Sequence, residues 1–190
     1  MEVTGLLEIR TREEFRKWLS NNHDKQRFCW ITISKGSTHD SILYLDAVEE
    51  AICFGWIDGT IKKSDDGRLV QRFSPRQKKS NWTELNKERA RRLERLGLMT
   101  DAGRRILPDM DEELVIHPTV HDALKADREV YNNFLKFPEL YKRVHLYNIH
   151  HALEDGQHEI FQKRLDRFIE NTKKNKMYGS WNDDGRLLEK

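Results

Sequence analysis

A dense group of polar and aromatic side chains lies between residues 54 and 86, where the chain reads FGWIDGTIKKSDDGRLVQRFSPRQKKSNWTELN. A hydrophobic core does not need these residue types at such density, so the run predicts a ligand-binding site. The candidate binding residues are Trp56, Asp58, Arg72, Arg76, Ser80, Asn81, Trp82 and Asn86.

The second half of this run favours an anionic ligand. Arg72 and Arg76 supply donors for phosphate or carboxylate. A helix predicted to begin at Asn81 would add free backbone N–H groups, and Trp82 offers a face for a planar ligand. A purely structural role explains the same residues: the arginines can pair with Asp58, Asn81 can cap the helix and Trp82 can seal the core. The sequence leaves both interpretations open.

Asp58 is the one candidate for acid or base catalysis in this run. A single carboxylate after an apolar segment more often caps a turn or forms an ion pair. No second acid, activated nucleophile or metal-ligand set accompanies it at a recognisable spacing. Whether the protein is an enzyme is therefore undecided.

Neither a metal nor a cofactor is predicted. His117 and His121 have the spacing of a helical zinc pair, but Pro118 places His117 outside the helix. No glycine-rich phosphate loop or dinucleotide fingerprint occurs. The run KERARRLER (87–95) is interrupted by glutamates, so it predicts a solvated helix face rather than a nucleic-acid contact.

Composition predicts a globular protein with a highly charged surface. The 190 residues are 37% hydrophobic and 35% charged, with a net charge of only +2, which disfavours a dedicated nucleic-acid binder. The N-terminus does not resemble a secretory signal, and no apolar run is long enough to span a membrane. Cys29 and Cys53 lie in apolar segments, which favours buried free thiols and a cytoplasmic location.

The first half of the chain predicts a mixture of helices and strands. Thr11 and Glu14 have capping-box spacing ahead of a helix over 12–21, and FCWITIS (28–34) is typical of a strand. Asp46 and Glu49 indicate the start of a buried helix that Gly55 ends. Asp66-Gly67 predicts a hairpin. The last predicted elements are a helix over 81–96, with its arginines facing solvent, and a short helix from residue 100.

The second half predicts helices alone. They begin near Val120, Val130 and Pro138, and the last two long helices meet near Asp155-Gly156. The predicted fold is α+β: a small antiparallel sheet with packed helices, followed by a helical C-terminal part. The predicted organisation is an N-terminal domain over 1–107, an acidic linker over 108–118, a helical region over 119–175 and a frayed polar tail over 176–190.

Three stretches of the chain also resemble the YdeI/OmpD-associated family, whose members are often labelled bacteriocin-protection proteins. They are YLDAVEEAICFGWIDG (44–59), RFSPRQKKSNWTELN (72–86) and LGLMTDAG (96–103). The chain departs from the family at 155–158, where it has Asp-Gly-Gln-His in place of a Glu-Thr-Arg-like run. The resemblance implies a role in stress or bacteriocin protection, and no reaction or cofactor.

These observations predict a cytoplasmic protein that binds a small anionic molecule through the 54–86 run. The first alternative is an enzyme that uses Asp58 in the same cleft. The second is a nucleic-acid or protein interaction module that uses the helix over 81–96. The sequence specifies no protein partner.

Overall fold

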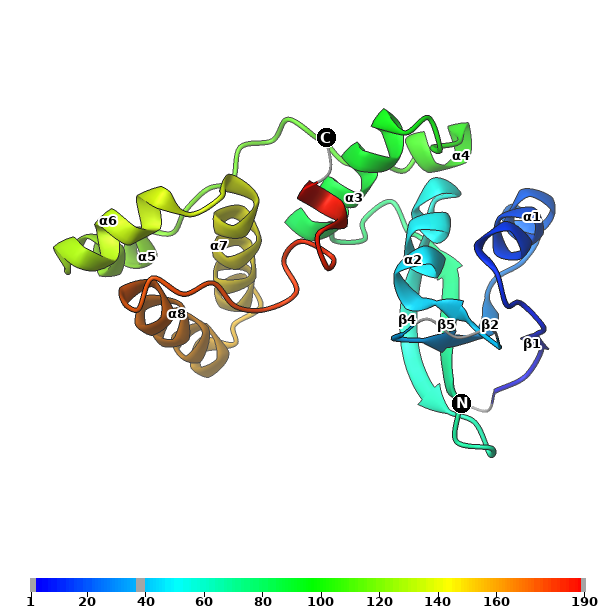
Figure 1. Cartoon of the computed structure of the whole chain (residues 1–190). Coiled ribbons are helices and arrows are strands. Elements are labelled where there is room, and N and C mark those ends of the chain that lie inside the picture. The colour runs from blue at the N-terminus through cyan, green and yellow to red at the C-terminus, as the bar shows by residue number, and fades with distance from the viewer. Residues whose placement is uncertain (1–2, 37–39, 189–190) are drawn as a thin grey trace. The chain divides into compact units, whose positions relative to one another are not determined.

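The computed structural model of the protein describes residues 3–36 and 40–188 (Figure 1). The last two residues of the predicted tail lie outside this range. The chain forms two compact units: unit 1 comprises Met1–Asn81 and Arg89–Pro108, and unit 2 comprises Trp82–Glu88 and Asp109–Lys190. The α+β fold class is confirmed, with the strands in unit 1 and a helical C-terminal part in unit 2.

Unit 1 is built around a small sheet. Its strands are β1 (Leu6–Leu7), β2 (Cys29–Ser34), β3 (Ile42–Leu43), β4 (Trp56–Lys63) and β5 (Leu69–Pro75). They are ordered β1-β2-β5-β4, and β3 also pairs with β2. β2, β5 and β4 are antiparallel as predicted, whereas the two short strands β1 and β3 run parallel to β2. The sheet is therefore mixed, because the chain crosses over before pairing each short strand with β2.

Helix α1 (Arg12–Asn22) begins with the predicted capping box. The Thr11 side chain accepts a hydrogen bond from the backbone N–H of Glu14, whose carboxylate accepts from the backbone of Thr11 in return. α1 buries Phe15 and Leu19 completely, and the Phe15 ring lies 5.3 Å from that of Phe73 on β5. These contacts fix α1 to the sheet.

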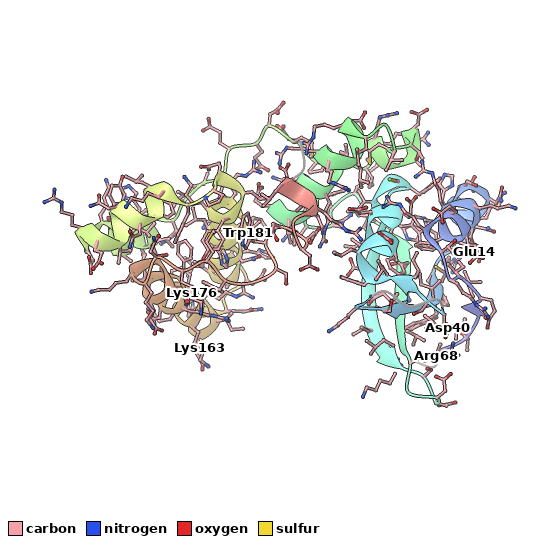
Figure 2. The ribbon with its side chains drawn as sticks, viewed as in Figure 1. Glu14, Asp40, Arg68, Lys163, Lys176 and Trp181 are labelled. Atoms are coloured by element: carbon pink, nitrogen blue, oxygen red, sulfur yellow. The ribbon has the colours of Figure 1, made fainter. Side chains whose placement is uncertain are left out.

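The predicted Asp66-Gly67 hairpin joins β4 to β5. Gly67 adopts a φ of 81°, which favours glycine. Hydrogen bonds from the Ser64 hydroxyl and from Arg68 lower the pKa of Asp66 to about 2. Figure 2 shows Arg68 at this end of the hairpin. The turn is thus held by local polar contacts.

Helix α2 (Tyr44–Cys53) begins earlier than predicted. Leu43 occupies the position before its first residue and provides no side-chain cap, so the expected start at Asp46 is wrong. The predicted end is correct, because Gly55 adopts a φ of 72° directly after the terminal Phe54. The helix is buried as predicted, but its buried residues include two glutamates.

A buried ion network surrounds these glutamates. Glu49 and Glu50 are each only 1% exposed. Arg12 donates to both at 2.6 Å, Arg16 donates to Glu50 at 2.7 Å, and Arg92 donates to Glu49 at 2.9 Å. These pairs join α1, α2 and the part of α3 (Glu84–Arg95) that belongs to unit 1. The predicted solvent-facing position of Arg92 is therefore wrong, and Arg89 is also buried.

Helix α3 starts three residues later than predicted. The Thr83 hydroxyl accepts a hydrogen bond from the N–H of Asn86, so Thr83 caps the helix in place of Asn81. The predicted short helix follows as α4 (Asp101–Arg104), and the Thr100 side chain caps it.

Unit 2 is helical, as predicted. Its helices are α5 (Pro118–Lys125), α6 (Arg128–Lys136), α7 (Glu139–Glu154), α8 (His158–Lys173) and the 3-10 helix η1 (Arg186–Leu188), together with the first turns of α3. His117 precedes α5 and stands outside it, because Pro118 is the first helical residue. Asn133 of α6 is buried and donates to the carbonyls that end α8.

The segment after Lys173 is packed, so the predicted fraying is wrong for its described residues. Trp181, labelled in Figure 2, is 7% exposed, and its ring lies 5.5 Å from that of Tyr141 on α7. Leu187 is buried as well. The sequence predicted fraying because the tail is mostly polar, and its few apolar residues gave too weak a signal of packing.

His145 on α7 makes the stability of unit 2 depend on pH. Burial lowers its pKa from 6.5 to about 4, although its Nε2 lies 3.1 Å from the Tyr178 carbonyl. The folded state therefore binds fewer protons than the unfolded state between these values, so stability falls as the pH drops through this window.

We expect His145→Gln to flatten this dependence by about 1 kcal/mol per pH unit between pH 6.5 and pH 4, because one fewer proton is taken up on unfolding. Urea unfolding at several pH values measures the slope. His158→Gln is the control, since His158 is exposed. An unchanged slope in His145→Gln would show that other groups cause the acid sensitivity.

Candidate functional site

The predicted site residues are divided between the two faces of the sheet and between the two units. Asp58 on β4 pairs with Phe73 on β5. Because side chains alternate along a strand, Arg72 projects from the opposite face of the sheet. Trp82 and Asn86 belong to unit 2, whereas the other six predicted residues belong to unit 1. Within unit 1, Asp58 and Arg72 therefore do not share one face of the sheet, and the anion site predicted between 54 and 86 stays a prediction.

Asp58 accepts a hydrogen bond from the Tyr44 hydroxyl at 2.7 Å. Tyr44 is the first residue of α2, so this contact ties the helix start to β4. The negative charge of Asp58 also acts on Arg76, whose pKa it raises in opposition to burial. Asp58 thus has structural partners on both sides.

Arg76 has a structural position. It is 5% exposed, its Nη1 donates to the Asn81 carbonyl at 2.9 Å, and its backbone N–H donates to Gly55 at the same distance. Burial lowers the pKa of the guanidinium to about 10, so it is protonated at neutral pH. Arg76 therefore links the end of β5 to the segments on either side.

The remaining predicted residues also support the backbone or the core. Ser80 closes a turn with Gln77, through one hydrogen bond in each direction. Trp82 is buried. Trp56 is 1% exposed and donates from Nε1 to the carbonyl of His23 at 3.1 Å. The structural alternative thus accounts for most of the run.

A cleft of about 500 Å³ lies elsewhere in unit 1. We call it the cationic cleft; it is lined by Thr4, Gly5, Leu7, Trp18 and residues 25–29. The parallel register of β1 with β2 pairs Leu6 with Trp30, which sets the segment before β1 beside the segment before β2. Trp18 comes from α1.

Two cations and two aromatic rings give the cationic cleft its chemistry. Lys25, Arg27 and Phe28 are exposed, and no acidic residue is among the described residues that line it. Lys25 Nζ donates to the Asn21 carbonyl at 2.9 Å, and Arg27 has no hydrogen bond or ion pair within residues 3–36 and 40–188. Such a surface favours a negatively charged ligand.

Arg72 connects the predicted run to this cleft. Its guanidinium carbon lies 4.7 Å from the centroid of the Phe28 ring, a cation–π geometry. Arg72 does not line the cleft itself. Its buried Nε has no hydrogen-bond partner among the described residues. Of the eight predicted residues, Arg72 contacts Phe28 and Trp56 contacts Trp18, so both lie behind the wall of the cationic cleft.

The thiol in the cationic cleft is not an activated nucleophile. Cys29 is 3% exposed, and burial raises its pKa to about 12 despite the charge of Arg72. Both cysteines are free and buried, as predicted. The cleft therefore offers binding groups and no thiolate at neutral pH.

A second, smaller cleft of about 260 Å³ contains part of the predicted run. It is lined by Phe54, Gly55, Trp56, Pro75 and Lys78, with His23 and Asp24 after α1 and residues from α4 onward. Its charged side chains are of both signs, because Asp24 lies beside Lys78 and Arg105. The described lining of the cationic cleft differs from it in having no acidic residue.

The sequence interpretation missed Lys25, Arg27 and Phe28. The local signal was the run KQRF directly before a strand, which combines two cations with an aromatic residue. Phe28 was assigned to the strand, but β2 begins at Cys29. Its ring is therefore available to the cleft.

Unit 1 is thus a small α+β unit with a cationic, aromatic-walled cleft. A family model described as a domain of unknown function (DUF8412) matches residues 7–106. The chain belongs to this family, and the match extends from the last residue of β1 to just beyond α4. No curated protein and no solved structure matches the chain.

Proposed function

We propose that the protein binds a small anionic molecule in the cationic cleft. The observation that carries this proposal is the pairing of Lys25 and Arg27 in a concave surface whose described lining has no acidic residue. The volume of about 500 Å³ lies within the range of small-molecule sites. Partial enclosure strengthens a charge-assisted hydrogen bond relative to an open surface.

The sequence resemblance leads us to propose a biological role for this binding. The YdeI/OmpD-associated resemblance suggests that ligand binding serves protection against stress or bacteriocins, in the cytoplasm. None of the helices described in residues 3–36 and 40–188 combines the length and the apolar character needed to cross a membrane.

The two alternative functions have less support. Neither cleft is lined by Asp58, and its carboxylate is engaged with the Tyr44 hydroxyl. On α3, Arg92 pairs with Glu49 and Arg89 is buried, so these arginines are not presented to a nucleic acid. Small-anion binding is therefore the function that we propose.

We expect Arg27→Ala to weaken anion binding about tenfold, because one charge-assisted hydrogen bond is lost. Lys25→Ala should have a similar effect. Isothermal titration of the full-length protein with pyrophosphate, citrate and adenosine 5′-monophosphate measures it.

Lys17→Ala is the matched control, since Lys17 is an exposed cation on α1 that does not line the cleft. The proposal is wrong if no anion binds the unmodified protein. It is equally wrong if Arg27→Ala and Lys25→Ala bind as tightly as Lys17→Ala.

A further inference from the structure

We infer that the cationic cleft selects a planar aromatic anion, such as a nucleoside monophosphate, over an anion without a ring. This inference rests on the proposed function and adds the class of ligand. The juxtaposition that carries it is two aromatic side chains, each held by other residues, beside two cations in one cleft.

Phe28 is the first aromatic wall. Phe28 is 37% exposed, which places it among the large apolar residues of the described chain that keep part of their surface open to solvent. The guanidinium of Arg72, 4.7 Å from the ring centroid, holds the ring in position from β5. Phe28 is thus an exposed ring on a fixed support, which suits stacking against a planar group.

Trp18 is the second aromatic wall, and its orientation is set by two neighbours. Its ring stacks on Phe15 with centroids 6.3 Å apart and meets Trp56 edge-on at 5.7 Å. Trp56 is itself anchored by its hydrogen bond to His23. A side chain held in this way loses little conformational entropy when a ligand stacks on it.

The space in the cleft also exceeds what a simple anion needs. Gly5 lines it, and a Cβ added to Gly5 would meet no atom within 4 Å. A volume of about 500 Å³ accommodates a ring system together with its anionic group. An inorganic anion would engage Lys25 and Arg27 but would leave the aromatic walls without a partner.

Recognition then divides between two kinds of contact. The cations bind the anionic group of the ligand and supply most of the affinity for any anion. The rings distinguish planar ligands from the rest, because stacking on an aromatic side chain does not depend on the identity of the ring. We expect broad acceptance of planar anions rather than recognition of one base.

Isothermal titration of the full-length protein tests this inference with four probes: adenosine 5′-monophosphate, 1-naphthyl phosphate, ribose 5-phosphate and inorganic phosphate. The two planar probes should bind at least about tenfold more tightly than the two without a ring, the scale of one stacking contact. Phe28→Leu should remove most of the difference in affinity between the planar probes and those without a ring.

Phe28→Tyr is the matched control, since it retains the ring and should retain the preference. Thermal melting of each variant verifies its fold. If ribose 5-phosphate binds as tightly as the planar probes, or if Phe28→Leu keeps the preference, the inference is wrong and anion binding stands. If none of the four probes binds, the inference is wrong, and the proposed function is wrong as well if pyrophosphate and citrate also fail to bind.

Discussion

Glu50→Gln is expected to lower the free energy of unfolding by about 3 kcal/mol, since removal of one partner from a buried ion pair leaves the other charge without compensation. Glu50 is 1% exposed and accepts from Arg12 and Arg16 at 2.6 and 2.7 Å. Burial by itself lowers the pKa of both arginines, and the neighbouring carboxylates more than reverse this effect. A neutral amide would deprive Arg16 of its carboxylate partner, whereas Arg12 would keep its ion pair with Glu49.

Urea unfolding at neutral pH measures the effect, and Glu13→Gln is the control. Glu13 is an exposed residue of α1, so the same chemical change there should alter stability by less than about 0.5 kcal/mol. Equal stabilities of the two variants would mean that Glu50 is solvated and that the network does not join the helices of unit 1.

The ion network around Glu50 could not be predicted from the sequence, because its partners are distant along the chain. The capping box at Thr11 and the hairpin at Asp66-Gly67 are local, so their residue spacing was enough to predict them. The partners of Glu50 lie 38 and 34 residues earlier in the chain. Only the packing of α1 on α2 brings them together, and two adjacent glutamates in an apolar helix look like solvent contacts until that packing is known.

The prediction of the candidate site from sequence failed to identify the cleft for a similar reason, because the contacts that form it are not local. Asp58 and Arg72 suit a binding site by residue type, but the pairing of Asp58 with Phe73 puts them on opposite faces of the sheet. Residues 4–7 and 25–29 form the cationic cleft because β1 pairs with β2 over two residues. So short a strand has no detectable periodicity in the sequence.

Gly103→Ala in α4 is expected to destabilise unit 1 by about 2 kcal/mol, because overpacking a tight contact costs roughly 1–3 kcal/mol. In an ordinary helix the same change would stabilise by up to about 1 kcal/mol. Here the added Cβ would collide with the Cys53 carbonyl and come within 2.8 Å of the Ile52 oxygen. These are backbone atoms, so they cannot rotate away, and the steric cost outweighs the gain in helix propensity.

The same displacement would disturb the contact that holds α4 in place. The Thr100 hydroxyl donates to the Cys53 carbonyl at 2.6 Å, and the Thr100 backbone N–H donates to it at 3.2 Å. Gly36→Ala is the control for urea unfolding, since Gly36 is exposed and its Cβ would meet no atom within 4 Å. If Gly103→Ala is as stable as Gly36→Ala, α4 does not pack against the end of α2 at this distance. The second cleft, which is lined by Ala102 of α4 and by Phe54 and Gly55 directly after α2, then has a different shape.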